Sequence, residues 1–167
     1  MNTPLYQAAQ KLFDLAIAHG VMITTAESCT GGMISMAITD IPGSSEVLDR
    51  SFITYSNASK SEMLGISERL IAEEGAVAAS VAAAMAQGAL NSSKADIAVG
   101  ITGIAGPIGS TDDKPIGLVY IAAVTRDGRV DSSEFRFGNI GRGAVRERTS
   151  IEALNMMSRL IDVPMNV

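Results

Sequence analysis

The sequence has 167 residues, a length that fits one domain and leaves little room for a second. Hydrophobic residues make up 47% of the chain and aromatic residues only 4%, which indicates a globular core built from small aliphatic side chains and methionine. The formal net charge of −5 argues against a general nucleic-acid-binding protein, because phosphate contacts need a basic surface.

The first half of the chain alternates predicted helices with predicted strands. Helical apolar periodicity, short apolar runs, and glycine or proline at the turns define the boundaries. The predicted elements are a helix at 4–18 with Thr3 as N-cap and Gly20 after its end, a strand at 21–25, a helix at 33–39, a strand at 51–55, a short helix capped by Asn57, and an alanine-rich helix at 76–90.

The second half is predicted to add three strands and a final helix. A strand at 96–101 is apolar between its ends, as a central strand would be, and a glycine-rich loop follows it. Strands at 117–124 and 130–137 flank the hairpin signal Asp127-Gly128, and a helix is predicted at 144–161. The pattern predicts a single-domain α/β fold, a three-layer sandwich whose mixed sheet of about five strands has helices on both faces.

The scarcity of cysteine and histidine restricts the chemistry. Cys29 and His19 are each the only residue of their type, so neither an internal disulfide nor a four-ligand Cys/His zinc site can form. The first residues lack the features of a signal peptide, and no run reaches the roughly 18 apolar residues of a membrane span. We therefore expect a cytoplasmic protein without a metal or other cofactor, and His19 is expected simply to end the first helix.

The segment Ala26 to Gly32 (AESCTGG) offers the first candidate nucleophile, Ser28, between a predicted strand and a predicted helix. Free N–H groups at the helix start, in Thr30, Gly31 and Gly32, can hold a developing oxyanion, and the glycines let a ligand approach the backbone. An ordinary N-cap with a glycine turn has the same residue types. Cys29 competes as nucleophile, since a thiol is more reactive than a hydroxyl at neutral pH.

The candidate base is Lys60, five residues after Tyr55. In the first turn of a helix capped by Asn57, the helix dipole shifts the lysine pKa by well under one unit, about 0.3–1 kcal/mol. Lowering the pKa from about 10.4 to near 8 takes roughly 3 kcal/mol, so burial must supply the rest. A neutral lysine can accept a proton from a serine hydroxyl. A solvated lysine on a surface helix is the alternative.

Further ligand contacts are predicted in the glycine-rich loop and in the last helix. The loop follows a central strand, where open α/β sheets bind their ligands, although a long flexible connection has the same pattern. Arginines in the helix suit a carboxylate or phosphate, and a solvated helix face explains them equally well. The candidates are Thr102, Gly103 and Gly106 in the loop, and Arg142, Arg146 and Arg148 in the helix.

Seven short segments together resemble the CinA C-terminal domain family. They span nearly the whole chain in the family's order, and AESCTGG with TGIAGP is a highly specific pair. The segments are 26–32 (AESCTGG), 42–45 (PGSS), 54–57 (TYSN) with Lys60, 75–77 (GAV), 102–107 (TGIAGP), 114–117 (KPIG) and 145–148 (VRER).

The resemblance implies a stand-alone nicotinamide-nucleotide amidohydrolase domain over residues 1–167, without the molybdopterin-binding-like N-terminal domain of full-length relatives. It implies hydrolysis of nicotinamide mononucleotide to nicotinate mononucleotide and ammonia. It also implies an acyl-enzyme mechanism that uses Ser28, Lys60 and Tyr55. Segment 138–143 departs from the family pattern, so the resemblance does not choose the arginine that meets the phosphate.

A binding module is the alternative function, in which the same loops hold a nucleotide without turnover. For partners we expect a small-molecule nucleotide substrate, and neither nucleic acid nor a membrane. The alanine-rich helix and the nine methionines suggest closely packing surfaces, so we also expect a homo-oligomer, with a dimer favoured.

Overall fold

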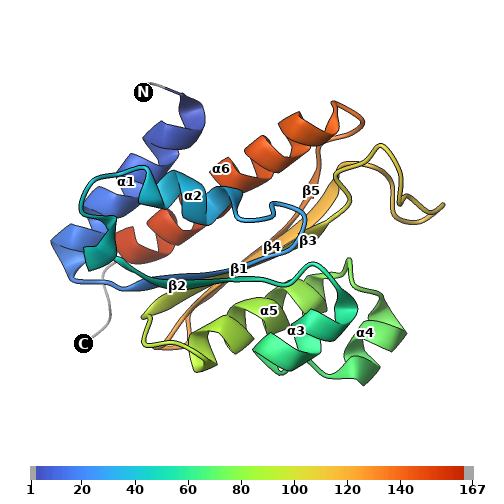
Figure 1. Cartoon of the computed structure of the whole chain (residues 1–167), viewed down its shortest axis with the longest axis horizontal. Coiled ribbons are helices and arrows are strands. Elements are labelled where there is room, and N and C mark those ends of the chain that lie inside the picture. The colour runs from blue at the N-terminus through green and yellow to red at the C-terminus, as the bar shows by residue number, and fades with distance from the viewer. Residues whose placement is uncertain (1–2, 164–167) are drawn as a thin grey trace.

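The computed structural model describes residues 3–163, which form a five-stranded sheet between two layers of helices (Figure 1). The predicted α/β sandwich with a mixed sheet is confirmed. The elements are, in chain order, α1 (Pro4–His19), β1 (Ile23–Glu27), α2 (Met33–Thr39), the 3-10 turn η1 (Ser44–Glu46), β2 (Leu48–Ile53), α3 (Asn57–Leu64), α4 (Glu68–Glu74), α5 (Ala79–Asn91), β3 (Ile97–Gly103), β4 (Leu118–Thr125), β5 (Val130–Arg136) and α6 (Arg142–Asp162).

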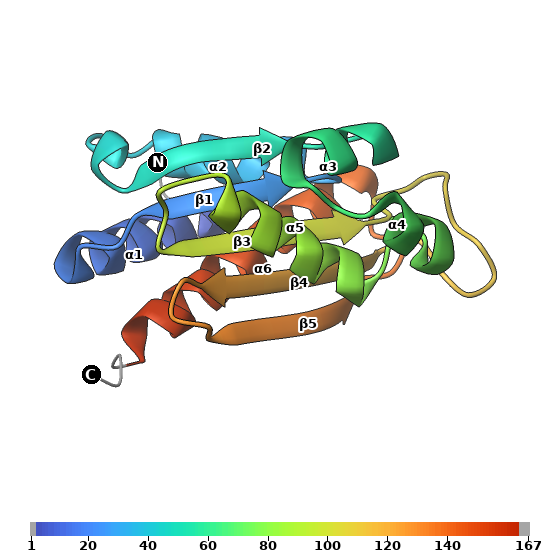
Figure 2. The same cartoon turned by 90° about the horizontal axis from the view of Figure 1, so that it is seen from below.

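The strand order is β2-β1-β3-β4-β5 (Figure 2). β1 pairs in parallel with both β2 and β3, whereas β3 with β4 and β4 with β5 pair antiparallel. The carboxyl ends of the three parallel strands and the start of β4 therefore meet at one edge of the sheet. Open α/β sheets bind ligands at such an edge.

Helices α1, α2 and α6 cover one face of the sheet, and α3, α4 and α5 cover the other (Figure 1). Small residues bring the layers close together. A Cβ on Gly100 of β3 would lie 2.2 Å from the carbonyl oxygen of Ala82, and one on Gly88 of α5 would lie 2.3 Å from that of Leu64. These glycines thus set how near α5 lies to the sheet and to α3, as the composition predicts.

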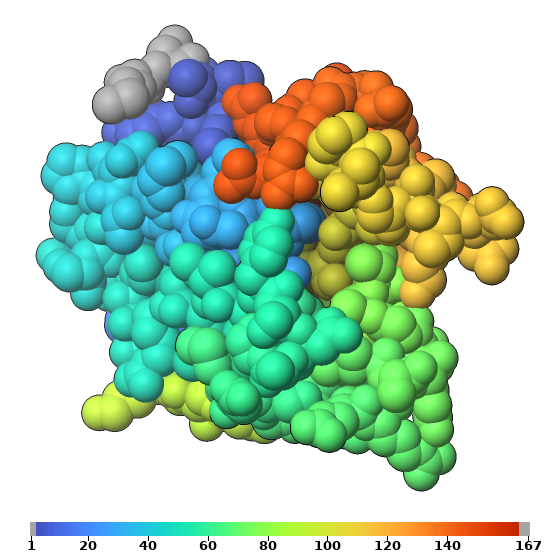
Figure 3. All heavy atoms as spheres, turned by 45° about the vertical axis from the view of Figure 1, so that its right-hand side comes forward, coloured from blue at the N-terminus to red at the C-terminus, as the bar shows by residue number. Residues whose placement is uncertain are grey.

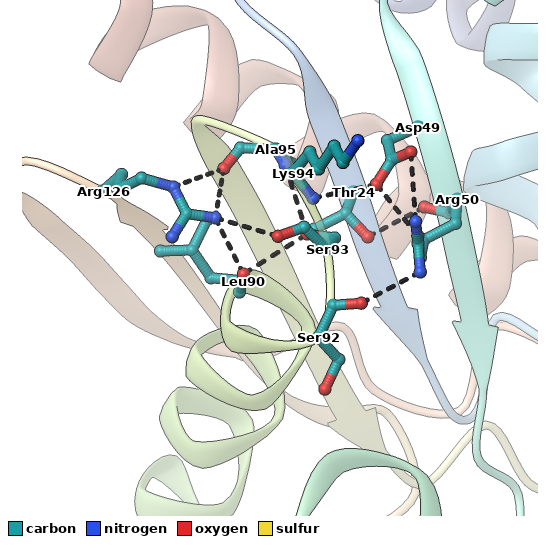
Figure 4. Close-up of polar contacts among 9 residues, drawn as sticks. All are labelled: Thr24, Asp49, Arg50, Leu90, Ser92, Ser93, Lys94, Ala95 and Arg126. Carbon is teal, nitrogen blue, oxygen red and sulfur yellow. Dashed lines mark hydrogen bonds and ion pairs between the residues drawn. The ribbon is translucent and has the colours of Figure 1, made fainter.

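Two arginines fasten the end of α5 to the sheet (Figure 4). Arg126 Nη2 donates to the carbonyl oxygens of Leu90 at 2.8 Å and Ala95 at 2.7 Å, and Arg50 Nη1 donates to that of Ser92 at 3.1 Å. Cations suit the carboxyl end of a helix, where carbonyl groups lack intrahelical partners. The connection from α5 to β3 is therefore held from both sides.

The predicted ends of α1 are confirmed. The Thr3 side chain accepts a hydrogen bond from the Tyr6 N–H at 3.2 Å, and Gly20 ends the helix in the left-handed region with φ 63°. The Asp127-Gly128 hairpin signal also lies where predicted, between β4 and β5. None of the helices within residues 3–163 is long and apolar enough to cross a membrane.

The predicted cap of α3 is wrong. Asn57 is the first helical residue, and Ser56 is the N-cap. The Ser56 hydroxyl accepts from the Ser59 N–H at 3.1 Å, and the Ser59 hydroxyl accepts from the Ser56 N–H at 3.2 Å. This reciprocal capping box satisfies two otherwise free donors, which gives Ser56 the advantage over Asn57.

Three other predictions in this region differ from the structure. The strand predicted at 51–55 is Leu48–Ile53, and the short helix α4 was not predicted; its N-cap residue, Ser67, makes no side-chain capping bond. The helix predicted at 76–90 begins at Ala79. Ala76, where this helix was predicted to begin, lies outside it. Its carbonyl oxygen instead accepts a hydrogen bond from the Thr102 hydroxyl at 2.7 Å.

Candidate active site

Ser28 lies in a tight turn directly after β1. The Gly31 N–H donates to the Ser28 carbonyl oxygen at 3.0 Å, which closes the turn. Gly31 and Gly32 follow with φ 57° and 93°, a backbone region that residues with a Cβ rarely adopt. The two glycines thus let the chain turn sharply from the strand into α2 and leave Ser28 at the ligand-binding edge of the sheet.

Lys60 meets Ser28 from the other side of the site. The capping box fixes the start of α3, and from there the lysine side chain points inward until the residue is only 1% exposed. Its Nζ lies 3.1 Å from Ser28 Oγ and 2.7 Å from the carbonyl oxygen of Thr54. Burial lowers the pKa of the Lys60 amine below its ordinary value. Burial therefore shifts this amine toward its neutral form beside a hydroxyl.

Tyr55 lies at the mouth of the same site but contacts a different partner. Its side chain is 60% exposed, and its hydroxyl accepts a hydrogen bond from Arg142 Nη2 at 2.6 Å. Arg142 Nη1 also donates to the Gly106 carbonyl oxygen at 2.9 Å. Within residues 3–163, no hydrogen bond joins Tyr55 to Ser28 or Lys60.

These groups surround a cavity of about 260 Å³. In the space-filling view, the segments after β2 and β3 and the start of α6 (teal, yellow and orange) gather around a hollow on this side of the molecule (Figure 3). The walls are formed by Ser28, Cys29, Tyr55, Asn57, Lys60, Ala76, Val77, Thr102, Gly103, Ile104, Ala105, Gly106, Ile108, Gly109 and Arg142.

Arg146 lies outside the walls of this cavity and holds the nucleophile turn. Its Nε donates to the Cys29 carbonyl oxygen at 3.1 Å, and its Nη2 donates to that of Thr30 at 2.8 Å. Of the three arginines of this run, only Arg142 therefore lines the cavity. Arg148, the third basic residue of this run, is exposed.

The prediction of free N–H groups on Gly31 and Gly32 is wrong. The Gly31 N–H closes the turn onto Ser28, and the Gly32 N–H donates to Glu27 Oε2 at 2.9 Å. Among the described residues, the Cys29 and Thr30 N–H groups have no hydrogen-bond partner in another residue. These two groups, directly after Ser28, are the donors of the turn that no other described residue takes, although the Cys29 N–H also faces its own thiol.

Sequence reasoning missed Glu27, a fully buried carboxylate at the end of β1. The available signal was a charged residue inside an otherwise buried strand, directly before a glycine turn. Charged side chains are almost never fully buried unless they are paired or hydrogen-bonded, so the position marked an internal polar contact.

Cys29, the rival nucleophile, is 5% exposed. Burial raises the pKa of its thiol to about 11, so the reactive thiolate is scarce at neutral pH. The Ser28 hydroxyl, by contrast, has the Lys60 amine within hydrogen-bonding distance.

Among the described residues, no metal site or second cavity resembles the site formed by Ser28 and Lys60. Within residues 3–163, no group of three or more His, Cys, Asp or Glu side chains is placed to hold a metal ion. A larger cavity of about 460 Å³ lies at the opposite edge of the sheet, beside His19 and Arg126. In its walls the Thr125 hydroxyl donates to the Asp127 carboxylate, but hydrogen bonds from Thr125 and Arg129 lower the pKa of Asp127, which makes it a weak base.

Comparison with known proteins identifies related sequences. The CinA C-terminal domain model matches residues 5–161. A protein of Escherichia coli strain K12 named nicotinamide-nucleotide amidohydrolase PncC is 42% identical over 156 residues, which are 93% of this chain and 94% of that protein. A protein of Caldicellulosiruptor saccharolyticus named for competence-damage induction is 49% identical over 148 residues, which are 89% of this chain but 36% of that protein. The chain thus spans about a third of the length of such relatives.

Comparison of the fold supports the same family as comparison of the sequence. The crystal structure of the competence/damage inducible protein CihA from Agrobacterium tumefaciens superposes with a TM-score of 0.94 and 44% identity, covering 96% of this chain and 97% of that chain. Sequence and fold agree over nearly all the described residues, and the chain belongs to the CinA C-terminal domain family.

Proposed function

We propose that this chain is a nicotinamide-nucleotide amidohydrolase that converts nicotinamide mononucleotide into nicotinate mononucleotide and ammonia. The observation that carries the proposal is the buried Lys60 amine 3.1 Å from the Ser28 hydroxyl, inside a cavity. The identity to the E. coli relative named for this activity supports the substrate, since it extends over 93% of the chain.

In the first half of the proposed reaction, the neutral Lys60 amine accepts the Ser28 proton as Oγ bonds the carboxamide carbon. The tetrahedral intermediate carries its negative charge on the former carbonyl oxygen, which the free N–H groups of Cys29 and Thr30 stabilise. As the C–N bond breaks, Lys60 returns the proton to the leaving nitrogen, and ammonia departs. An ester between Ser28 and the nicotinate carbonyl remains.

In the second half, water attacks this ester while Lys60 again accepts the proton. Collapse of the second intermediate returns the proton to Ser28 Oγ and releases nicotinate mononucleotide, which balances the reaction. Tyr55 lines the same cavity and is held by Arg142, so we assign it to orienting the substrate or relaying a proton at the cavity mouth.

The substrate phosphate is assigned to the wall formed by the loop after β3. Thr102 and Gly103 begin that wall, and Ala105 and Gly106 line it with N–H groups that have no partner within residues 3–163. Arg142 supplies a cation beside them. Charge-assisted contacts of this kind recognise phosphate oxygens well.

The proposed nucleophile is tested by ammonia release from nicotinamide mononucleotide. We expect Ser28→Ala to lower kcat by at least about a thousandfold, because the bond-forming oxygen is gone. Cys29→Ala should keep most activity, since it leaves the backbone N–H in place. Ser61→Ala is the matched control, because it removes a hydroxyl that lies outside the cavity. Activity lost in Cys29→Ala and kept in Ser28→Ala would contradict the assignment of the nucleophile. A wild-type protein that binds the nucleotide without releasing ammonia would instead be a binding module.

The role of Lys60 as base is tested by the pH dependence of kcat/KM. Burial lowers the Lys60 pKa, and only the neutral amine accepts a proton, so kcat/KM should rise with pH through that lowered pKa and then level off. Lys60→Arg should lose between about 10²- and 10⁴-fold in kcat, because arginine stays charged. A Lys60→Arg variant with near-normal turnover would show that the residue acts only as a positive charge.

The role of Arg142 is tested at low ionic strength. We expect Arg142→Ala to raise KM for the nucleotide about tenfold or more with a smaller change in kcat, and added salt should reduce the difference. Arg148→Ala removes an exposed arginine of the same helix that does not line the cavity, so its KM should stay unchanged. An unchanged KM in Arg142→Ala would assign the phosphate to backbone N–H groups alone.

A further inference from the structure

The carboxylate of Glu27 collects an unusual number of donors for a group with no cation beside it. Oε2 accepts from the N–H groups of Gly32 at 2.9 Å and Ile34 at 3.2 Å. Oε1 accepts from the Ser35 N–H at 2.9 Å, and the hydroxyls of Ser35 and Thr25 lie 3.1 and 3.3 Å away. Glu27 is 0% exposed, and within residues 3–163 it takes part in no salt bridge.

Hydrophobic packing does not explain this arrangement. Removing a carboxylate from water is costly, and here hydrogen bonds alone must compensate the loss. Three of the five donors are N–H groups in or just before the first turn of α2, which have no partners within the helix. The carboxylate therefore satisfies the start of α2 from inside the protein, and it joins that start to the end of β1.

The nucleophile lies between the two elements that Glu27 joins. Glu27 is the last residue of β1, and Ser28 to Gly31 form the turn that the carboxylate spans. Arg146 holds the same turn through the carbonyl oxygens of Cys29 and Thr30, while Glu27 holds it through N–H groups beyond it. The position of Ser28 Oγ relative to Lys60 Nζ thus depends on two contacts of opposite charge, one to carbonyl oxygens of the turn and one to N–H groups just beyond it.

We infer that Glu27 is a positioning residue of the amidohydrolase reaction: it holds the Ser28 turn so that Oγ faces Lys60, and it keeps the start of α2 closed to substrate anions. The inference rests on the proposed function for its substrate. Its basis is the hydrogen-bond geometry, in which both carboxylate oxygens face donors from α2. A phosphate then has no free N–H group at Gly32, Ile34 or Ser35 to bind.

The test compares Glu27→Gln with the wild type. Glutamine has nearly the same shape, but its amide nitrogen must face N–H donors, so the bonds at one of the two oxygens are lost. We expect kcat to fall at least tenfold with KM within about twofold, because binding groups are untouched while alignment is lost. The pH midpoint of kcat/KM should stay unchanged, since burial, and not Glu27, lowers the Lys60 pKa.

A second readout does not need the substrate. A fluorophosphonate labels an activated serine: Ser28 Oγ bonds phosphorus, fluoride leaves, and the hydroxyl proton passes to Lys60. We expect Glu27→Gln to slow labelling of the Ser28 peptide by the same factor as kcat. If the wild type releases no ammonia from nicotinamide mononucleotide yet labels at Ser28, and Glu27→Gln slows that labelling, the proposed function fails and the positioning role stands.

Leu90→Ala is the control for lost stability, because Leu90 is buried at the far end of α5 and lies outside the cavity. It should lower the melting temperature and leave both rates unchanged. Should Glu27→Gln not fold, Ser35→Ala removes one donor and keeps the carboxylate, and both rates should then fall about two- to fivefold. Unchanged rates in the folded variant, or a shifted pH midpoint with an unchanged labelling rate, would overturn the inference.

Discussion

The site depends on the removal of one lysine amine from water. Lys60 is 1% exposed, and within residues 3–163 its Nζ has two hydrogen-bonding partners, the Thr54 carbonyl oxygen and Ser28 Oγ. Neither partner is a carboxylate, so nothing in direct contact compensates an ammonium for its lost hydration, and the amine is driven toward its neutral form. In the proposed reaction this neutral amine serves as the general base, in a chain that has only one histidine.

The topology brings these two groups together. Ser28 follows β1, Lys60 belongs to the helix after β2, and the two strands are parallel neighbours whose carboxyl ends meet. From the other side, α6 reaches the site through Arg142 and Arg146, which contact residues 87 and 117 positions away. The turn that carries Ser28 is thereby held between β1, α2 and α6, with Ser28 and Cys29 lining the cavity.

The sequence predicted the layers and most strands because apolar periodicity and turn residues are local signals. It also supplied Ser28, Lys60 and Tyr55 as candidates. No rule of sequence spacing relates side chains 32 residues apart, so the family resemblance was needed to place the three in one site. Glu27 was missed, and the N–H groups of Gly31 and Gly32 were wrongly expected to be free. Both errors have the same cause: the hydrogen bonds of these groups form only when the chain folds, so no local sequence pattern shows them. The homo-oligomer and the cytoplasmic location stay predictions.

The central claim, a Lys60 amine held neutral beside Ser28, can be measured without substrate. In protein labelled with ¹³C at lysine Cε, the chemical shift of each Cε reports the charge of its amine, and the Lys60 signal is identified by its loss in Lys60→Arg. We predict a titration midpoint for Lys60 clearly below the ordinary lysine value of about 10.4. A Lys60 that titrates at or above that value would contradict the account.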